Sequence, residues 1–257
     1  MATMAQPSAA STATPEPTVQ RSPHLGQSIV TALVNGVQVP VACPTWFCTM
    51  DHAGRDAVGH LDDIDHTGED ADLMVPSFLN GDQLLAHAYL GQDPAASDPR
   101  MQDPHVRVTD GGDDFFLTPE MADIFARTVD TFGSKVRAFA HLARSTAPAE
   151  DGHFPWCNTS ACCTYEAGED GPYVDHQGIS ASVRAPRFMT SHEGVLVKAH
   201  LHSDAAYGNG GASVSITGSD GDGTILDPDE LGAVIDDLAG FLDQLRVMHL
   251  HLKAVQA

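Results

Sequence analysis

The chain has 257 residues, with 35 acidic and 13 basic side chains and a formal charge of −22 at pH 7. A surface this acidic repels a phosphate backbone, so nucleic-acid binding is unlikely and a basic protein partner is the expected kind of partner. The sequence shows neither an apolar run of membrane-span length nor the pattern of an export signal at residues 1–20. We therefore expect a cytoplasmic protein with reduced thiols and no membrane attachment.

The first elements in the chain are a tail and a hairpin. Residues 1–26 are rich in Ala, Ser, Thr and Pro without periodicity, which predicts a disordered tail. Apolar β-branched residues then flank Asn35-Gly36, a pair that suits the positive φ angles of a tight turn. The pattern predicts a β-hairpin that leads into Cys43, and the second half of the chain has no equivalent of it.

A stretch of Cys and His residues occurs twice, and each copy contains one of the two tryptophans, Trp46 and Trp156. In each copy a Cys or His stands three residues before the Trp, six after it and twenty after it. A further Cys follows each Trp by one or two residues. The predicted metal ligands are Cys43, Cys48, His52 and His66 in the first copy, and His153, Cys157, Cys162 and His176 in the second.

Cys and His exchange between the copies while the spacing holds, and this exchange favours zinc. A tetrahedral zinc ion accepts thiolate sulfur or imidazole nitrogen at nearly the same radius, whereas a disulfide requires two cysteines. Four ligands per site predict two structural zinc ions. The alternative is a duplicated domain with unrelated loop histidines. Two ligand choices stay open: His60 can displace His52 or His66, and Cys163 can replace Cys162.

The rest of each half predicts strands followed by one long helix. Strands are expected at residues 73–79, 83–90 and 105–109, with a loop at 93–104, and then at 180–185, 194–202 and 212–217. Thr118-Pro119-Glu120 predicts the start of a helix that ends near Arg144. Asp227 and Glu230 predict a capping box at the second helix.

These elements predict an α+β fold with two tandem repeats, each a Cys/His metal-binding loop followed by a small antiparallel sheet and a long C-terminal helix. The expected domains are residues 27–147 and 148–257. Cys-Pro-x-Trp-x-Cys at residues 43–48, His-x-Gly at 66–68 and Leu-Thr-Pro-Glu at 117–120 resemble an uncharacterised small Cys/His domain of actinobacteria and their phages and mobile elements. The resemblance implies fold and cellular origin and no particular chemistry.

The sequence contains neither a Ser-His-acid set, a His-Glu-x-x-His helix nor a zinc-deaminase pattern. The leading hypothesis is therefore a non-catalytic tandem zinc-binding module whose acidic surface mediates interaction with a protein partner. One alternative is a metal-dependent hydrolase with an open zinc site in one repeat. Another is an inhibitor whose acidic surface mimics DNA.

Overall fold

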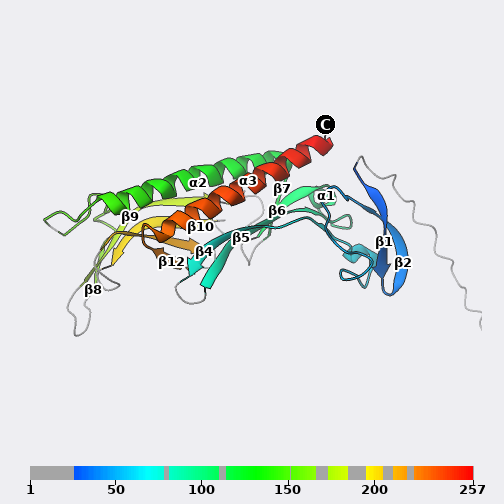
Figure 1. Ribbon diagram of the computed structural model, residues 1–257, viewed down its shortest axis with the longest axis horizontal. Helices are drawn as coiled ribbons and strands as arrows, with labels where there is room; N and C mark the ends of the chain where they lie inside the picture. Colours follow the sequence, from blue (N-terminus) through cyan, green and yellow to red (C-terminus); the bar gives the residue numbers. More distant parts are fainter. Residues whose placement is uncertain are drawn as a thin grey trace, which may run out of the picture.

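The computed structural model describes residues 26–77, 81–109, 114–150, 152–165, 173–184, 195–204, 211–218 and 223–256. The predicted tail, apart from Gly26, lies outside these residues. Two long helices run side by side over two antiparallel sheets, and a two-stranded hairpin lies at one end of the molecule (Figure 1). The predicted α+β class with antiparallel sheets is confirmed. The described helices include none that is long and apolar enough to cross a membrane.

The hairpin consists of β1 (Ser28–Val34) and β2 (Val37–Cys43). Asn35 and Gly36 join them with φ angles of 48° and 78°, as the tight-turn prediction requires. Alternating valines form one face of the hairpin, and Cys43 ends β2 on that same face because it pairs with Ser28 in the continuous register. The turn therefore determines which way Cys43 points when the chain enters the first Cys/His loop.

The first sheet contains β3 (His66–Thr67), β4 (Ala71–Ser77), β5 (Gly81–Gln92), β6 (His105–Thr109) and β7 (Asp114–Leu117). β3 and β4 pair with successive parts of β5, and β6 and β7 follow in order. The predicted loop at residues 93–104 contains a short helix, α1 (Pro99–Gln102), which is a correction. Its cause is local, because the Asp98 carboxylate caps the helix by accepting the Arg100 N–H at 3.0 Å.

The second sheet contains β8 (Cys163–Tyr165), β9 (Tyr173–Arg184), β10 (Val195–Asp204), β11 (Ser213–Gly218) and β12 (Gly223–Leu226). The strand order is β12-β11-β10-β9-β8. β9 begins well before the predicted position, so His176 lies on a strand rather than in a loop. This extension follows from pairing on both edges, with β8 on one side and β10 on the other.

The two helices, α2 (Pro119–Ser145) and α3 (Glu230–Gln256), start with the predicted caps. The Thr118 side chain accepts the Met121 N–H at 3.4 Å. At the second helix, the Asp227 carboxylate accepts the Glu230 N–H at 2.8 Å and the Glu230 carboxylate accepts the Asp227 N–H at 3.0 Å. Both caps satisfy backbone donors that the first helical turn leaves free.

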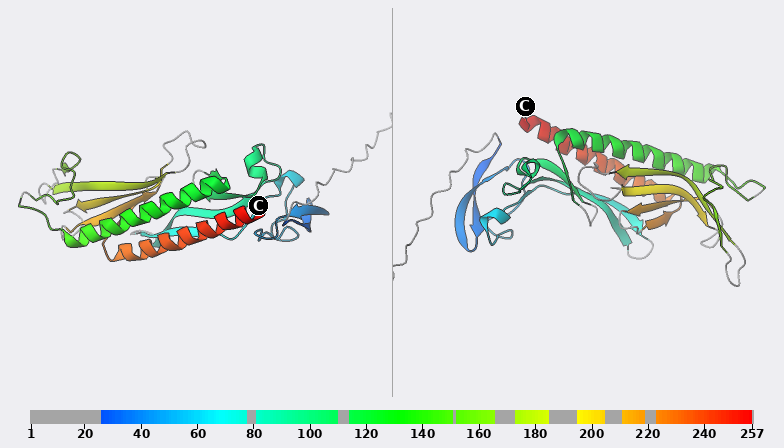
Figure 2. Two further views of the ribbon diagram at one scale, coloured as in Figure 1. Left: turned by 90° about the horizontal axis from the view of Figure 1, so that it is seen from above. Right: turned by 180° about the vertical axis from the view of Figure 1, so that it is seen from behind.

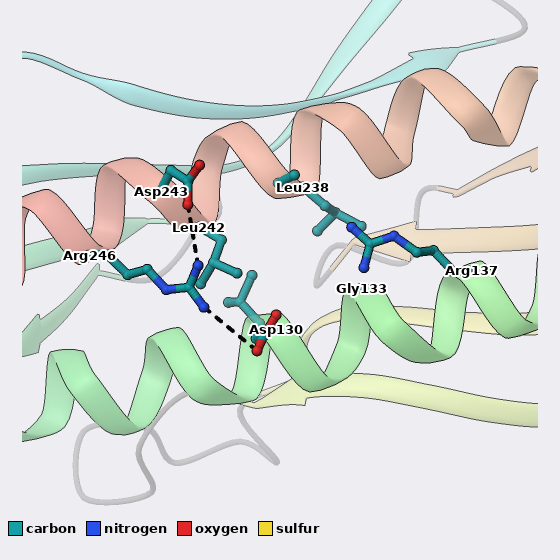
Figure 3. A pocket seen from close by; sticks show the side chains of 9 residues that line it. Asp130, Gly133, Arg137, Leu238, Leu242, Asp243 and Arg246 are labelled. Atoms are coloured by element: carbon teal, nitrogen blue, oxygen red, sulfur yellow. Dashed lines mark hydrogen bonds and ion pairs between the residues drawn. The ribbon is translucent and has the colours of Figure 1, made fainter.

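Each long helix covers the sheet of the other half of the chain. α2 packs against β9, β10 and β11, and it touches β6 and β7 only where it begins, whereas α3 packs against β4, β5 and β6. The two helices also pack along each other, as Figure 2 shows from above. Between the two helices, Arg246 of α3 lies 3.7 Å from Asp130 of α2 and 3.3 Å from Asp243 of its own helix (Figure 3). Because of this exchange, one continuous core contains buried residues from both halves.

Candidate metal centres

The first Cys/His cluster brings together all four side chains predicted in the first copy. The Nδ1 atom of His66 and the Nε2 atom of His52 lie 3.2 Å apart. The Sγ atom of Cys48 is 3.4 Å from His52 Nε2 and 3.6 Å from His66 Nδ1. The Sγ atom of Cys43 is 3.8 Å from His52 Nε2. One ligand atom from each residue lies within 4.8 Å of every other, and three of the four residues are buried.

The second Cys/His cluster brings together the four side chains predicted in the second copy. The Sγ atom of Cys157 lies 3.6 Å from the Nδ1 atoms of both His153 and His176. The Sγ atom of Cys162 lies 3.9 Å from His176 Nδ1. These four ligand atoms also lie within 4.8 Å of one another, but every residue of this cluster is only half-buried. The second cluster is therefore the more open of the two.

Strands and turns position the ligands of both clusters. Cys43 ends β2, and the backbone N–H of Cys48 returns to the Pro44 carbonyl at 2.9 Å, which folds the entry of the loop into a tight turn. In the second copy the Cys157 N–H bonds to the Phe154 carbonyl at 2.9 Å in the same way. His66 and His176 lie on strands that pair with β5 and β10, so one ligand of each cluster is fixed by a sheet.

The pKa shifts of Cys48 and His176 favour the forms of these side chains that bind a cation. A hydrogen bond between the two thiols of the first cluster holds the pKa of Cys48 far below its usual range, and the same bond together with burial raises that of Cys43. Burial and the nearby His153 ring lower the pKa of His176. A thiolate and a neutral imidazole are the forms of these side chains that bind zinc.

The two tryptophans pack their loops against the protein. Trp156 is buried and stacks on Phe154 with ring centroids 4.7 Å apart, and its indole N–H donates to the Thr146 hydroxyl at 3.0 Å. Trp46 is half-buried and lies edge-on against Phe47, again with centroids 4.7 Å apart. These contacts hold each Cys/His loop against the neighbouring part of the protein.

Sequence reasoning missed the role of Gly178. A Cβ atom at Gly178 would lie 2.6 Å from the Trp156 ring and 2.9 Å from the Cβ of Leu201, so only glycine leaves room for the tryptophan. Gly68 occupies the same place after the first histidine, and a Cβ there would lie 3.2 Å from the Phe47 carbonyl oxygen. The sequence contained a sign of this role, because both copies have the pattern His-x-Gly at the end of the loop.

The two residues that the sequence left open as ligands lie outside the clusters. His60 is exposed and begins the short 3-10 helix at residues 61–63, where its backbone N–H donates to the Asp63 carboxylate at 3.1 Å. Cys163 is exposed, and its Sγ atom lies 3.7 Å from the Ala161 carbonyl. Geometry therefore favours His52 and His66 over His60, and Cys162 over Cys163.

One family model matches the chain twice, over residues 27–148 and again over residues 142–254. Its description is domain of unknown function, DUF6907. No curated protein and no solved structure was found to match the chain. The double match covers nearly all of the described residues, and each match contains one complete Cys/His cluster.

Proposed function

The chain belongs to the DUF6907 family and carries two copies of its domain, and we propose that each copy binds one structural zinc ion with its Cys/His cluster. In this proposal each domain is a metal-binding loop followed by an antiparallel sheet and a long helix. The ligands are Cys43, Cys48, His52 and His66 for one ion, and His153, Cys157, Cys162 and His176 for the other.

The observation that carries the proposal is the match between the clusters and a zinc tetrahedron. Zinc bonds of about 2.3 Å to sulfur and about 2.05 Å to nitrogen give tetrahedral edges of about 3.6 Å between sulfur and nitrogen and about 3.3 Å between two nitrogens. The corresponding distances are 3.2 Å between the two nitrogens of the first cluster and 3.4 to 3.9 Å between sulfur and nitrogen in both. These distances are close to the edges of a zinc tetrahedron in both clusters.

Ligand type supports the same proposal. Cys43 in the first copy corresponds to His153 in the second, and His52 corresponds to Cys162, so the two exchanges compensate. Both clusters keep two cysteines and two histidines, and two thiolates neutralise a divalent cation in each. Four protein ligands complete the shell, which is the arrangement of a structural zinc ion, whereas a catalytic zinc keeps a position for water. The hydrolase alternative needs such an open position, and four converging side chains argue against it.

The acidic composition supports a second part of the proposal, in which this cytoplasmic zinc module acts by binding a basic protein partner. The formal charge of −22 favours association with a cationic surface and opposes binding to nucleic acid. Metal binding would contribute the folding free energy that the irregular loops cannot obtain from packing.

Cobalt substitution tests the metal proposal. Co²⁺ replaces zinc in tetrahedral sites and gives intense visible absorption there, with additional thiolate charge-transfer bands in the near ultraviolet. We expect two equivalents of Co²⁺ to bind with both signatures and zinc to displace them. Weak octahedral absorption, or thiolate bands that saturate at a single equivalent, would contradict two closed Cys/His sites.

A further inference from the structure

The β1–β2 hairpin is sparsely covered by the other described elements. β1 and β2 form a sheet of their own and pack chiefly against each other rather than against a helix or another strand. An isolated two-stranded hairpin is marginally stable in water, so an apolar face on it is normally covered. This hairpin is held at one edge by the first Cys/His loop, through the Leu33 N–H to the His52 carbonyl and the Asn35 N–H to the Val58 carbonyl, each 2.8 Å long.

One face of the hairpin is built from five valines, and we call it the valine face. The register places them together, because Val30 pairs with Val41 and Val34 with Val37, with Val39 between. On this face only Ala32 and Cys43 are buried; four of the valines are half-buried, and the fifth, Val37, is 61% exposed. Leu61, 51% exposed, follows closely after Val58, which bridges to Val34.

The loop beside the valine face is strongly acidic. Residues 51–65 contain five carboxylates and a single basic residue, Arg55. Arg55 is already paired with Asp56 at 3.1 Å, whereas the exposed Asp62 and Asp63 form no ion pair with any described residue. These two carboxylates follow Leu61 directly in the chain. An exposed apolar residue beside carboxylates that form no ion pair is complementary to a segment that carries both apolar and cationic side chains.

We infer that the valine face and the loop at residues 51–65 together dock a cationic, amphipathic segment of a protein partner. The inference rests on the proposed zinc-held loop and names the place and the chemistry of the partner. Charge selects this occupant over a second copy of the chain, because two molecules of charge −22 repel each other. Within the residues that the structure describes, such a hairpin occurs in the first half alone, so the two copies of the domain differ in this function.

Docking occurs through side chains rather than by addition of a strand. The outer edge of β1 is occupied near Leu33 and Asn35 by the Cys/His loop. In the register of a two-residue hairpin, Pro40 faces the outer edge of β2, where it removes a backbone donor in the middle of the strand. Neither edge therefore offers a continuous ladder to an added strand.

Binding of a fluorescein-labelled peptide of lysine and leucine at helical spacing tests this inference. We expect the full chain loaded with zinc to bind it at about 0.15 M salt, more weakly as salt rises, and not to bind the peptide with glutamate in place of lysine. Replacement of Asp62 and Asp63 by Asn should weaken binding about threefold to tenfold, and Val37→Thr by a similar factor. Matched controls with the same chemistry, Asp236→Asn with Asp237→Asn and Ile225→Thr, should not change it.

Any of the following three results would overturn the inference. Equal losses in the loop variants and their controls would show that the peptide responds only to net charge. A dimer in mass measurements that Val37→Thr dissociates would assign the valine face to a second copy. Stronger peptide binding after removal of residues 1–25 would assign it to the amino-terminal tail. Zinc content measured on every sample separates these results from failure of the metal proposal, since wild-type zinc without peptide binding rejects the docking surface alone.

Discussion

Trp46, in the first Cys/His loop, lies edge-on against His251 near the end of α3, with ring centroids 6.1 Å apart. The second loop makes the corresponding contact at the end of the other helix, where the Trp156 indole N–H donates to Thr146, the residue that follows α2. Each Cys/His loop therefore contacts the carboxyl end of the helix that covers its own sheet. For both loops, that helix comes from the opposite half of the chain.

Because each Cys/His loop contacts a helix from the other half of the chain, a substitution in one half is predicted to change zinc release from the cluster of the other half. His251→Ala removes an aromatic contact worth about 0.5–1.5 kcal/mol and is expected to speed release from the first cluster, although His251 belongs to the second half. Thr146→Val removes the hydroxyl that accepts the Trp156 N–H and is expected to speed release from the second cluster. Release to a chromogenic chelator, measured in Cys157→Ser and Cys48→Ser backgrounds, reports each site separately. If both substitutions acted on the same site, the crossed arrangement would be wrong.

Gly178→Ala is predicted to destabilise the second Cys/His loop. The added methyl group would meet the Trp156 ring at 2.6 Å, and Leu201 at 2.9 Å prevents the strand from moving aside. Overpacking of this kind costs about 1–3 kcal/mol, which urea denaturation measures directly. Gly211→Ala is the matched control, because a Cβ there meets nothing within 4 Å. Equal stability of the two variants would mean that the packing around Trp156 is not tight.

The folded protein is predicted to lose stability in mild acid because of the buried His105. Burial lowers the pKa of this histidine, and its Nδ1–H donates to the Asp103 carbonyl at 2.9 Å. The unfolded chain takes up the proton near pH 6.5 while the folded chain does not, so the stability present above about pH 6.5 falls as the pH drops towards the folded pKa.

The measurement is the free energy of unfolding of the wild type and of His105→Gln at about pH 7.5 and about pH 5.5. The wild type is expected to lose more stability over this interval, by at most about 1.4 kcal/mol per pH unit. His105 belongs to neither Cys/His cluster, so both proteins are expected to lose zinc alike in acid and the difference between them reports His105. Parallel pH profiles would show that this imidazole titrates alike in the folded and unfolded chains.

Short sequence patterns predicted those features of the fold that depend only on residues adjacent in the chain. Asn35-Gly36 predicted the hairpin turn, and Asp227 with Glu230 predicted the cap of α3, because each depends on a few adjacent residues. The repeated spacing predicted which Cys and His side chains converge, since matching offsets in two copies reflect one geometry. Short elements were missed: α1 lies in a Pro-rich stretch, and β7 and β12 have four residues each, too few for a periodic signal.

The helix exchange was beyond local reasoning. α2 and α3 each carry apolar residues at helical spacing, and that pattern predicts a buried face without identifying the sheet that buries it. Which sheet each helix covers depends on contacts between residues far apart in the chain. The choice between Cys162 and Cys163 likewise depends on where β8 begins, because Cys163 is its first residue and pairs with Asp175 of β9, whereas Cys162 precedes the strand.

Zinc stoichiometry tests the central claim most directly. Elemental analysis of the purified wild type, Cys48→Ser and Cys157→Ser proteins is predicted to give two, one and one zinc ions per chain, with a lower melting temperature in each variant. Cys163→Ser, which removes the thiol outside the clusters, is predicted to retain both ions. A wild type without zinc, or Cys48→Ser and Cys157→Ser proteins with the wild-type content, would contradict the assignment of one ion to each Cys/His cluster.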